Sequence, residues 1–224
     1  TQGIPLDVKV IDNSVKNENL HVIWNRLLAD SDAELFLNLS PDVIPEGAWL
    51  AYMLDVLDRY PEVVAVGPSS NRTYNEQGNR DPEIVGKAKG SWVPGVLPSG
   101  FCCLYRTKAL KALGGWREDF KFYGGDLDMV LRMRLAGGET AWSVPAFVWH
   151  EWGGSARKLG EEAFKELRRV GNEERKAAFQ SYHYPDGKPR QGLWIHQGVG
   201  KLDFQEGDLW NGKKETVSQR TYTG

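Results

Sequence analysis

Apolar and polar residues alternate in two rhythms along the first third of the chain. Residues 20–31 (LHVIWNRLLADS) place apolar side chains three and four positions apart, the spacing of a helix that buries one face. Residues 46–60 (EGAWLAYMLDVLDRY) repeat that spacing, and Pro61 ends the predicted helix. This pattern predicts an α/β fold with a mainly parallel central sheet flanked by helices. The predicted strands are the short apolar runs at 8–11, 33–39 and 62–68.

The rest of the chain continues this pattern after a long polar stretch. Residues 69–95 are rich in Asn, Gly and Pro and predict a loop or two. We expect an α/β domain over residues 1–155 and a helical, then turn-rich, C-terminal extension over 156–224. Later predicted elements are strands at 99–106 and 140–150, helices at 107–115 and 122–138, and one or two charged helices at 160–182.

Two acids stand beside two glycines where the helix at 122–138 begins. Asp126 and Asp128 could simply satisfy the free N–H groups of the first turn and interact favourably with the helix dipole. The alternative is that one of them faces a cleft and acts as a general base. Because residues two apart point in different directions on a helix, we expect Asp128 to cap the helix or to pair with Arg132.

Composition and charge narrow the class of protein. The 224 residues are 41% hydrophobic and 26% charged, with a net charge of −2 and a pI of about 6.1. This charge gives no support to nucleic acid as a partner. No apolar run reaches the roughly 18 residues that a membrane helix needs. The two cysteines are neighbours, Cys102 and Cys103, so no disulfide framework is expected and a reducing, cytoplasmic location fits.

Polar groups gather where the predicted strands end. In open α/β sheets, ligands bind outside the carboxyl ends of the strands, so these groups predict a binding site. Each has a structural alternative: an Asx-type turn, a turn residue after Pro41, or a hydrogen-bonded histidine at a strand end. The groups are Asp12, Asn13, Ser14, Ser40, Asp42 and His150.

Five segments, in order, resemble the family 2 glycosyltransferases with the GT-A fold, the group that includes rhamnosyltransferase-like enzymes. Each motif alone is weak, but their joint order and spacing are specific, and the resemblance covers roughly residues 5–155. The segments are VKVIDNS (8–14), NENLHVIWNRLL (17–28), LFLNLSPDVIPEGAWL (35–50), SGFCCLYRTKALKALGGWREDFKFYGGDLDMVLRMRLAGG (99–138) and VPAFVWHEWGGS (144–155).

The resemblance implies an inverting transferase that uses a nucleotide-diphosphate sugar, such as a UDP-, GDP- or dTDP-sugar, and an acceptor hydroxyl. It implies that Asp126 is the general base and that Asp42 and His150 bind Mn²⁺ or Mg²⁺. Trp116 and Trp152 could stack on an acceptor saccharide, or could be core residues. The donor-binding residues that it implies are Asp12, Asn13, Ser14, Asn25 and Ser40.

Three departures from the family pattern keep other functions open. Only about seven residues precede Val8, so the family's usual first strand and helix would be absent, trimmed, or replaced by a strand from the tail, for which residues 192–199 (GLWIHQGV) are a candidate. The metal segment has one acid, and Gly125 stands where an acid often precedes the base. One alternative is a non-catalytic GT-A-like module that binds a sugar or a protein. Another is an enzyme that glycosylates modified DNA bases. The C-terminal extension would cover the acceptor site or mediate self-association, and the location would be cytoplasmic or peripheral at a membrane.

Overall fold

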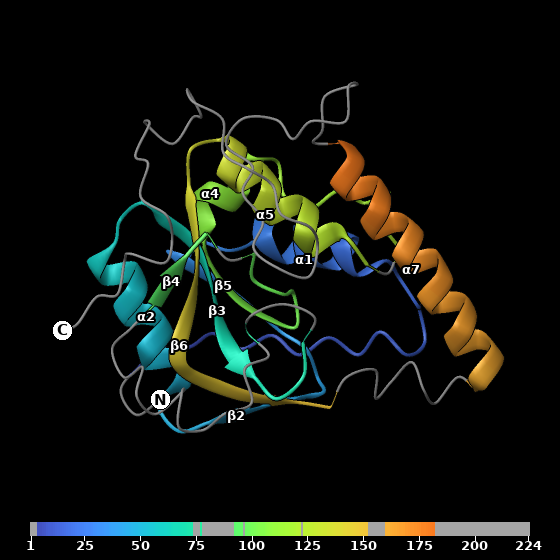
Figure 1. Ribbon diagram of the computed structural model, residues 1–224, viewed down its shortest axis with the longest axis horizontal. Helices are drawn as coiled ribbons and strands as arrows, with labels where there is room; N and C mark the ends of the chain where they lie inside the picture. Colours follow the sequence, from blue (N-terminus) through green and yellow to red (C-terminus); the bar gives the residue numbers. More distant parts are fainter. Residues whose placement is uncertain are drawn as a thin grey trace.

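The computed structural model describes residues 4–73, 77, 92–95, 97–121, 123–151 and 160–181. One six-stranded sheet forms its centre, with helices on both faces (Figure 1). The strands are β1 (Leu35–Leu39), β2 (Val43–Glu46), β3 (Val63–Ser70), β4 (Trp92–Pro94), β5 (Cys102–Arg106) and β6 (Glu139–His150). The helices are α1 (Leu20–Ala29), α2 (Trp49–Arg59), α4 (Thr107–Ala112), α5 (Gly125–Leu135) and α7 (Glu161–Ser181).

The sheet is mixed, which corrects the prediction of a mainly parallel sheet. Its order is β1-β5-β3-β6-β2, and β4 pairs with β6 beside this path. Of the pairings between described strands, β3–β6 is parallel and the others are antiparallel. β1, β3 and β6 therefore run in one direction, as a strand–helix–strand rhythm requires. β5 enters between β1 and β3 in the opposite direction, which periodicity alone does not reveal.

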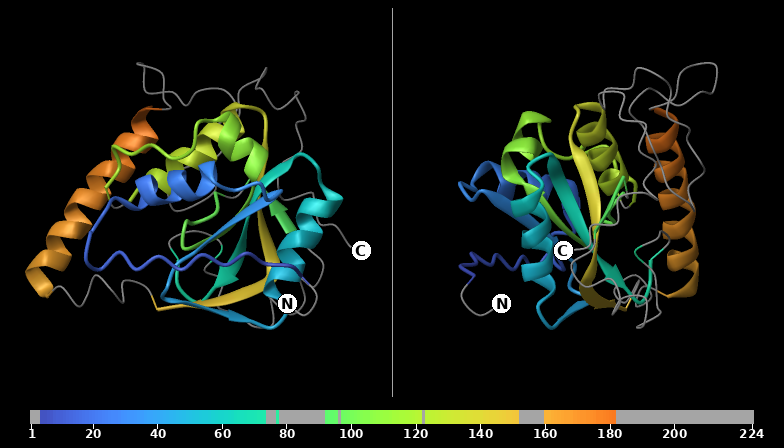
Figure 2. Two further views of the ribbon diagram at one scale, coloured as in Figure 1. Left: turned by 180° about the vertical axis from the view of Figure 1, so that it is seen from behind. Right: turned by 60° about the vertical axis from the view of Figure 1, so that its left-hand side comes forward.

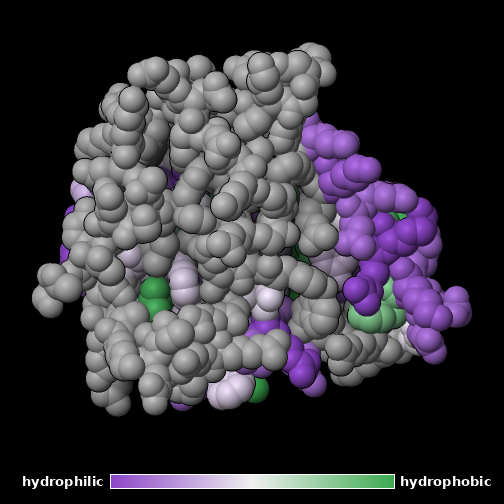
Figure 3. All heavy atoms as spheres, in the orientation of Figure 1, coloured by the Kyte–Doolittle hydropathy of each residue, from purple (hydrophilic) through white to green (hydrophobic). Residues whose placement is uncertain are grey.

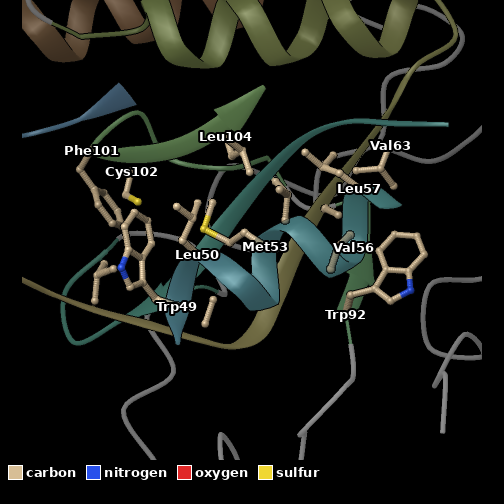
Figure 4. Close-up of a cluster of buried hydrophobic side chains, with 14 of the residues drawn as sticks. Trp49, Leu50, Met53, Val56, Leu57, Val63, Trp92, Phe101, Cys102 and Leu104 are labelled. Atoms are coloured by element: carbon tan, nitrogen blue, oxygen red, sulfur yellow. The ribbon is translucent and has the colours of Figure 1, made fainter. Parts of the chain in front are cut away.

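Each face of the sheet buries its own apolar cluster. Met53 and Leu57 of α2 pack on one face, against Leu104 of β5 (Figure 4). Met129 of α5 packs on the other face, together with residues of α1 and α4, against Tyr105 of β5. Because successive side chains on a strand point to opposite faces, neighbouring residues of β5 belong to different clusters. Figure 2 shows α2 on one side of the sheet and α1, α4 and α5 on the other.

β6 bends in its second half and so reaches the end of β3. Its register with β3 jumps between the pairs Pro68–Ser143 and Ser69–Phe147. Ser69 stabilises the bend, because its hydroxyl donates to the carbonyl of Val144 (2.7 Å). The bend lets the last residues of β6 pair with β2 as well. Figure 1 shows β6 curving round the lower edge of the sheet.

The first predicted strand does not form. Residues 4–13 belong to no helix or strand, and Val8 and Val10 are 71% and 88% exposed. An alternating apolar run becomes a strand only where a neighbouring strand supplies hydrogen bonds, and no such pairing includes this run. The structure adds two strands that were not predicted, β2 and β4, which are only four and three residues long.

α7 is a single helix of 21 residues, where one or two were predicted. It packs against α5 on the outside of the molecule. The side chains of α7 that are visible in Figure 3 are mostly hydrophilic. None of the helices in the described part of the chain is long and apolar enough to cross a membrane.

Candidate active site

The turn between β1 and β2 carries Ser40 and Asp42. The Ser40 amide donates to the carbonyl of Phe101 (2.8 Å), and the Val43 amide donates back to the Ser40 carbonyl (3.1 Å). The Asp42 carbonyl accepts from the amide of Glu151 (2.9 Å), so the turn is also tied to the end of β6. The Asp42 side chain is 17% exposed and remains within reach of solvent.

His150, the last residue of β6, is held on three sides. Its backbone amide donates to the side-chain oxygen of Asn71 (2.7 Å), and its Nδ1 lies 3.2 Å from the carbonyl of Arg72. Its ring stacks on Phe101 at a centroid distance of 4.4 Å and an interplanar angle of 21°. Its Nε2 lies 3.5 Å from Oδ2 of Asp42. The predicted metal pair is thus brought together from positions 108 apart in the sequence.

The hydrogen bonds of His150 indicate the tautomer of its ring. A carbonyl only accepts, so Nδ1 carries the proton that faces Arg72. Nε2 then presents either a lone pair or a second proton to Asp42. A lone pair facing a carboxylate is unfavourable unless a cation lies between them. Nε2 and Oδ2 are therefore placed either to share a proton or to bind one cation.

The donor atoms fit a divalent cation. Ligands about 2.0–2.2 Å from one ion lie roughly 3 Å or slightly more apart, close to the separation of Asp42 and His150. A histidine that binds a metal through Nε2 usually donates its Nδ1–H to a carbonyl or carboxylate, as His150 does. Among the described residues, no group of three or more His, Cys, Asp or Glu side chains is placed to hold a metal. Remaining ligands would come from a phosphate or from water.

Asp126 lies in the first turn of α5 and is half buried. Its Oδ2 accepts from the amide of Gly100 (2.8 Å), and its Oδ1 accepts from the amide of Leu127 (2.9 Å). Together the two bonds fix the orientation of the carboxylate. Each oxygen has a further lone pair with which to accept a proton. A Cβ at Gly100 would lie 2.7 Å from Cβ of Asp126, so only glycine allows this close approach.

The segment Gly100–Phe101 connects the two parts of the site. The Gly100 amide bonds to Asp126, while the ring of the next residue stacks on His150 and its carbonyl accepts from Ser40. The predicted base and the predicted metal pair therefore contact adjacent residues of one loop. The sequence pattern did not predict that this loop connects Asp126 with Asp42 and His150.

Asp128 takes the structural role predicted for it. Its side chain is fully buried, and Oδ2 accepts from Nε of Arg132 (2.8 Å). Its Oδ1 lies 3.6 Å from Nη1 of Arg117. Arg132 also donates to the carbonyls of Leu113 and Gly115, which ties α5 to the end of α4.

Steric crowding explains why a glycine, Gly125, precedes Asp126. A Cβ at Gly125 would lie 2.1 Å from Nε2 of His21, whose ring lies directly over this glycine. The Nδ1 of His21 lies 2.8 Å from the carbonyl of Phe120, so the ring is anchored there. An acid at position 125 would have no room for its side chain.

A buried thiol and a buried phenol lie near Asp126 on the sheet. Burial raises the pKa of the Cys103 thiol well above its usual range, and the negative charge of Asp126 adds to the shift. Burial likewise raises the pKa of the Tyr105 phenol, with smaller contributions from Cys103 and Asp126. Both groups are therefore neutral around pH 7.

The three predicted donor residues near the N-terminus lie in an exposed turn. The Asp12 carboxylate accepts from the amide of Ser14 (2.9 Å), and hydrogen bonds from Ser14 lower the pKa of Asp12. Asn13 bonds to the backbone of Glu18 through both atoms of its side-chain amide. These bonds form an Asx-type turn, the structural alternative to donor binding that the sequence also allowed. The Asp12 carboxylate remains exposed to solvent.

Two other predicted residues hold the backbone or the core. The amide group of Asn25 donates to the carbonyl of Trp116 (2.8 Å) and accepts from its N–H (2.7 Å), so it fixes the turn after α4. Trp116 is 2% exposed, and its ring contacts Trp24, Phe36 and Tyr105. This corrects its prediction as a sugar platform, because no face of the ring is open. Trp152 lies outside the described residues.

Residues of the loop after β3 also support the site, which their sequence pattern did not predict. Gln77 is fully buried; its Nε2 donates to the Pro68 carbonyl (2.9 Å), and its Oε1 accepts from the Ser99 amide (2.9 Å). It thereby supports the segment that contacts Asp126. Asn71 and the Arg72 carbonyl orient His150 in the same way. The polar composition of residues 69–95 predicted a loop but not which of its side chains turn inward.

Comparison with known proteins finds similarity among solved structures but not among sequences. No family model matches the chain, and no curated protein sequence matches it. Among solved structures, it is similar to the mannosyltransferase PcManGT from Pyrobaculum calidifontis, in complex with GDP-Man and Mn²⁺. Sequence identity is 16%, the TM-score is 0.41, and the match covers 72% of this chain and 53% of the mannosyltransferase. The chain thus spans about half the length of that enzyme, and its function must be argued from its own residues.

Proposed function

We propose that this chain is an inverting glycosyltransferase that moves a sugar from a nucleoside-diphosphate donor to an acceptor hydroxyl. The observation that carries the proposal is the segment Gly100–Phe101, which contacts Asp126 on one side and His150 on the other. A carboxylate that can act as a base and a His–Asp pair that can hold a cation are thus connected through adjacent residues. The ordered motifs that resemble family 2 glycosyltransferases agree with this assignment.

Asp126 is the proposed general base. It accepts the proton of the acceptor hydroxyl while that oxygen forms a bond to the anomeric carbon of the donor sugar. The bond from the anomeric carbon to the phosphate oxygen breaks, and its electron pair leaves with the nucleoside diphosphate. Attack and departure occur on opposite faces of the sugar, so the configuration inverts. The two amide donors keep Asp126 oriented while it takes up the proton.

The donor side is proposed to consist of Asp42, His150 and the exposed turn at Asp12. Asp42 and His150 would hold Mn²⁺ or Mg²⁺, which when bound neutralises negative charge on the departing diphosphate. Ser40 precedes Asp42 in the same turn and is proposed to contact the donor. The exposed carboxylate of Asp12, whose pKa is lowered by its hydrogen bonds to Ser14, would accept hydrogen bonds from the nucleoside.

Calorimetric titration of uridine, guanosine and thymidine diphosphates, with and without Mn²⁺, tests the donor site. We expect one nucleotide to bind at least about tenfold more tightly with Mn²⁺, and Asp42→Ala to remove this difference. Asp55→Ala is the matched control, because Asp55 pairs with Arg59 on the exposed face of α2.

Two results would contradict the proposal. Equal affinity with and without Mn²⁺ would remove Asp42 and His150 from the donor site. Failure of all three nucleotides to bind would favour the non-catalytic sugar- or protein-binding module instead.

A further inference from the structure

α7 contacts the segment that leads into the proposed catalytic helix. Oε1 of Glu174 accepts from the backbone amide of Lys121 (2.8 Å), and Oε2 accepts from the amide of Tyr123 (3.1 Å). One carboxylate on α7 therefore holds two backbone N–H groups from residues two apart. Hydrogen bonds to a charged acceptor are stronger than those between neutral groups.

A glycine allows α7 to come this close. Gly171 is buried, and a Cβ there would lie 1.7 Å from Cδ2 of Tyr123. Residues 171 and 174 are three apart, so they lie on the same face of the helix. The ring of Tyr123 covers Gly171, and the residue as a whole is 41% exposed. α7 thus contacts both the backbone and a side chain of the segment.

The held segment continues directly into the first turn of α5. Gly124 adopts φ 88°, which favours glycine, and its carbonyl accepts from the amide of Asp128 (2.7 Å). Asp126 lies between these two residues. Its carboxylate bonds to Gly100 on the sheet side, and its backbone follows the segment held by Glu174 on the outer side.

Other glutamates of α7 behave differently. Glu166 and Glu173 pair with Arg169, and Glu161 and Glu162 pair with Lys165, along the helix itself. These pairs are exposed, and such surface ion pairs contribute little to stability. Glu174 instead directs its carboxylate to the backbone of a distant segment, 53 and 51 residues away in sequence.

We propose that Glu174 is a positioning residue for the glycosyl transfer proposed above. It fixes residues 121 and 123 so that Asp126 stays aligned with the Gly100 amide and with the acceptor hydroxyl. Tyr123, packed on Gly171 and partly exposed, lies three residues before the base. This inference rests on the proposed function and assigns to α7, outside the region of family resemblance, a part in the reaction.

The test combines hydrogen exchange with kinetics on three variants of the full chain. In Glu174→Ala we expect amide exchange at residues 121 and 123 to rise by about tenfold or more, because two charge-assisted bonds are lost. We expect kcat to fall by about tenfold or more, while the KM for the donor stays within about twofold, since Asp42 and His150 are untouched. Glu174→Gln keeps one acceptor oxygen and should give intermediate values of both. Glu173→Ala, on the neighbouring residue, should change neither.

The outcomes separate this inference from the proposed function. Unchanged exchange in Glu174→Ala would overturn the inference, whatever the activity. Raised exchange with unchanged kcat would also overturn it, because the contact would then serve stability alone. If the wild-type chain transfers no sugar from any donor, the proposed function fails, and raised exchange would leave Glu174 only a structural contact.

Discussion

Two carboxylates proposed for the same reaction, Asp126 and Asp12, are held in opposite ways. Asp126 lies in the first turn of a helix whose other residues are largely buried, and the Gly100 amide, 26 residues away, holds its carboxylate in place. Asp12 lies in an exposed stretch, and its carboxylate bonds to Ser14, two residues away. The first is positioned by the fold and the second by its own turn.

This difference fits the two roles proposed for these carboxylates. A general base must keep its orientation to within a fraction of an ångström, because the rate depends steeply on the geometry of the reacting atoms. A residue that binds the nucleoside contributes affinity, and it can be ordered when the ligand arrives. Changes at Asp126 should therefore affect kcat strongly, whereas changes at Asp12 should affect binding modestly.

The largest expected effect is the loss of transfer in Asp126→Asn. An amide cannot take up the acceptor proton, so kcat should fall by about 10²–10⁴-fold. Its side-chain oxygen still accepts one N–H, so the free energy of unfolding should change by only about 1 kcal/mol. Steady-state kinetics and urea unfolding measure the two quantities, with Asp119→Asn as the exposed control. Wild-type turnover in Asp126→Asn would show that another group is the base.

The next largest effect is on the free energy of unfolding, and it concerns Asp128, the other acid in the first turn of α5. Asp128→Ala removes the buried partner of Arg132 and Arg117, and should lower the free energy of unfolding by about 3 kcal/mol. Asp119→Ala also removes a partner of Arg117, but this carboxylate is 61% exposed, so the loss should stay below about 1 kcal/mol. Urea unfolding of both variants makes the comparison. Equal losses would mean that burial does not distinguish the two acids.

The sequence predicted most of the elements but not the directions of all the strands. Helical spacing located α1 and α2, and short apolar runs located β1 and β3, because one-sided burial produces those periods. The run at 8–11 has the composition of a strand but no partner. The antiparallel insertion of β5 depends on long-range pairing, which local pattern does not contain.

The site was predictable in its residue types and less so in its contacts. The family resemblance indicated Asp42, His150 and Asp126, and the structure brings Asp42 and His150 within 3.5 Å. The resemblance did not indicate the Gly100 amide, because almost every residue has a backbone N–H group and only the fold decides where it points. The prediction that Trp116 contacts the acceptor sugar was wrong. Aromatic side chains are common both in sugar-binding sites and in hydrophobic cores, and the ring of Trp116 lies in the core.

The smallest expected effect is that of Asp12→Ala. The Asp12 side chain is exposed, and its hydrogen bond is to Ser14 in the same turn. The midpoint of thermal unfolding should therefore not change measurably. The affinity for the nucleotide found by calorimetry should fall by about tenfold, the usual result of losing one hydrogen bond to a charged group. The kcat at saturating donor should stay within about twofold, because this contact is equally present before and during the reaction.

The contrast between Asp126 and Asp12 would be wrong if Asp12→Ala lowered kcat as Asp126→Asn is expected to. A large fall in kcat at saturating donor would mean that the exposed turn is ordered against the reacting groups, and that the fold positions both carboxylates. An unchanged nucleotide affinity would instead leave Asp12 with the structural role that its bond to Ser14 already provides. Asp7→Ala is the matched control, since Asp7 is an exposed carboxylate of the same stretch that pairs with Lys9. Only a loss of affinity in Asp12→Ala, without one in Asp7→Ala, places the nucleoside at this turn.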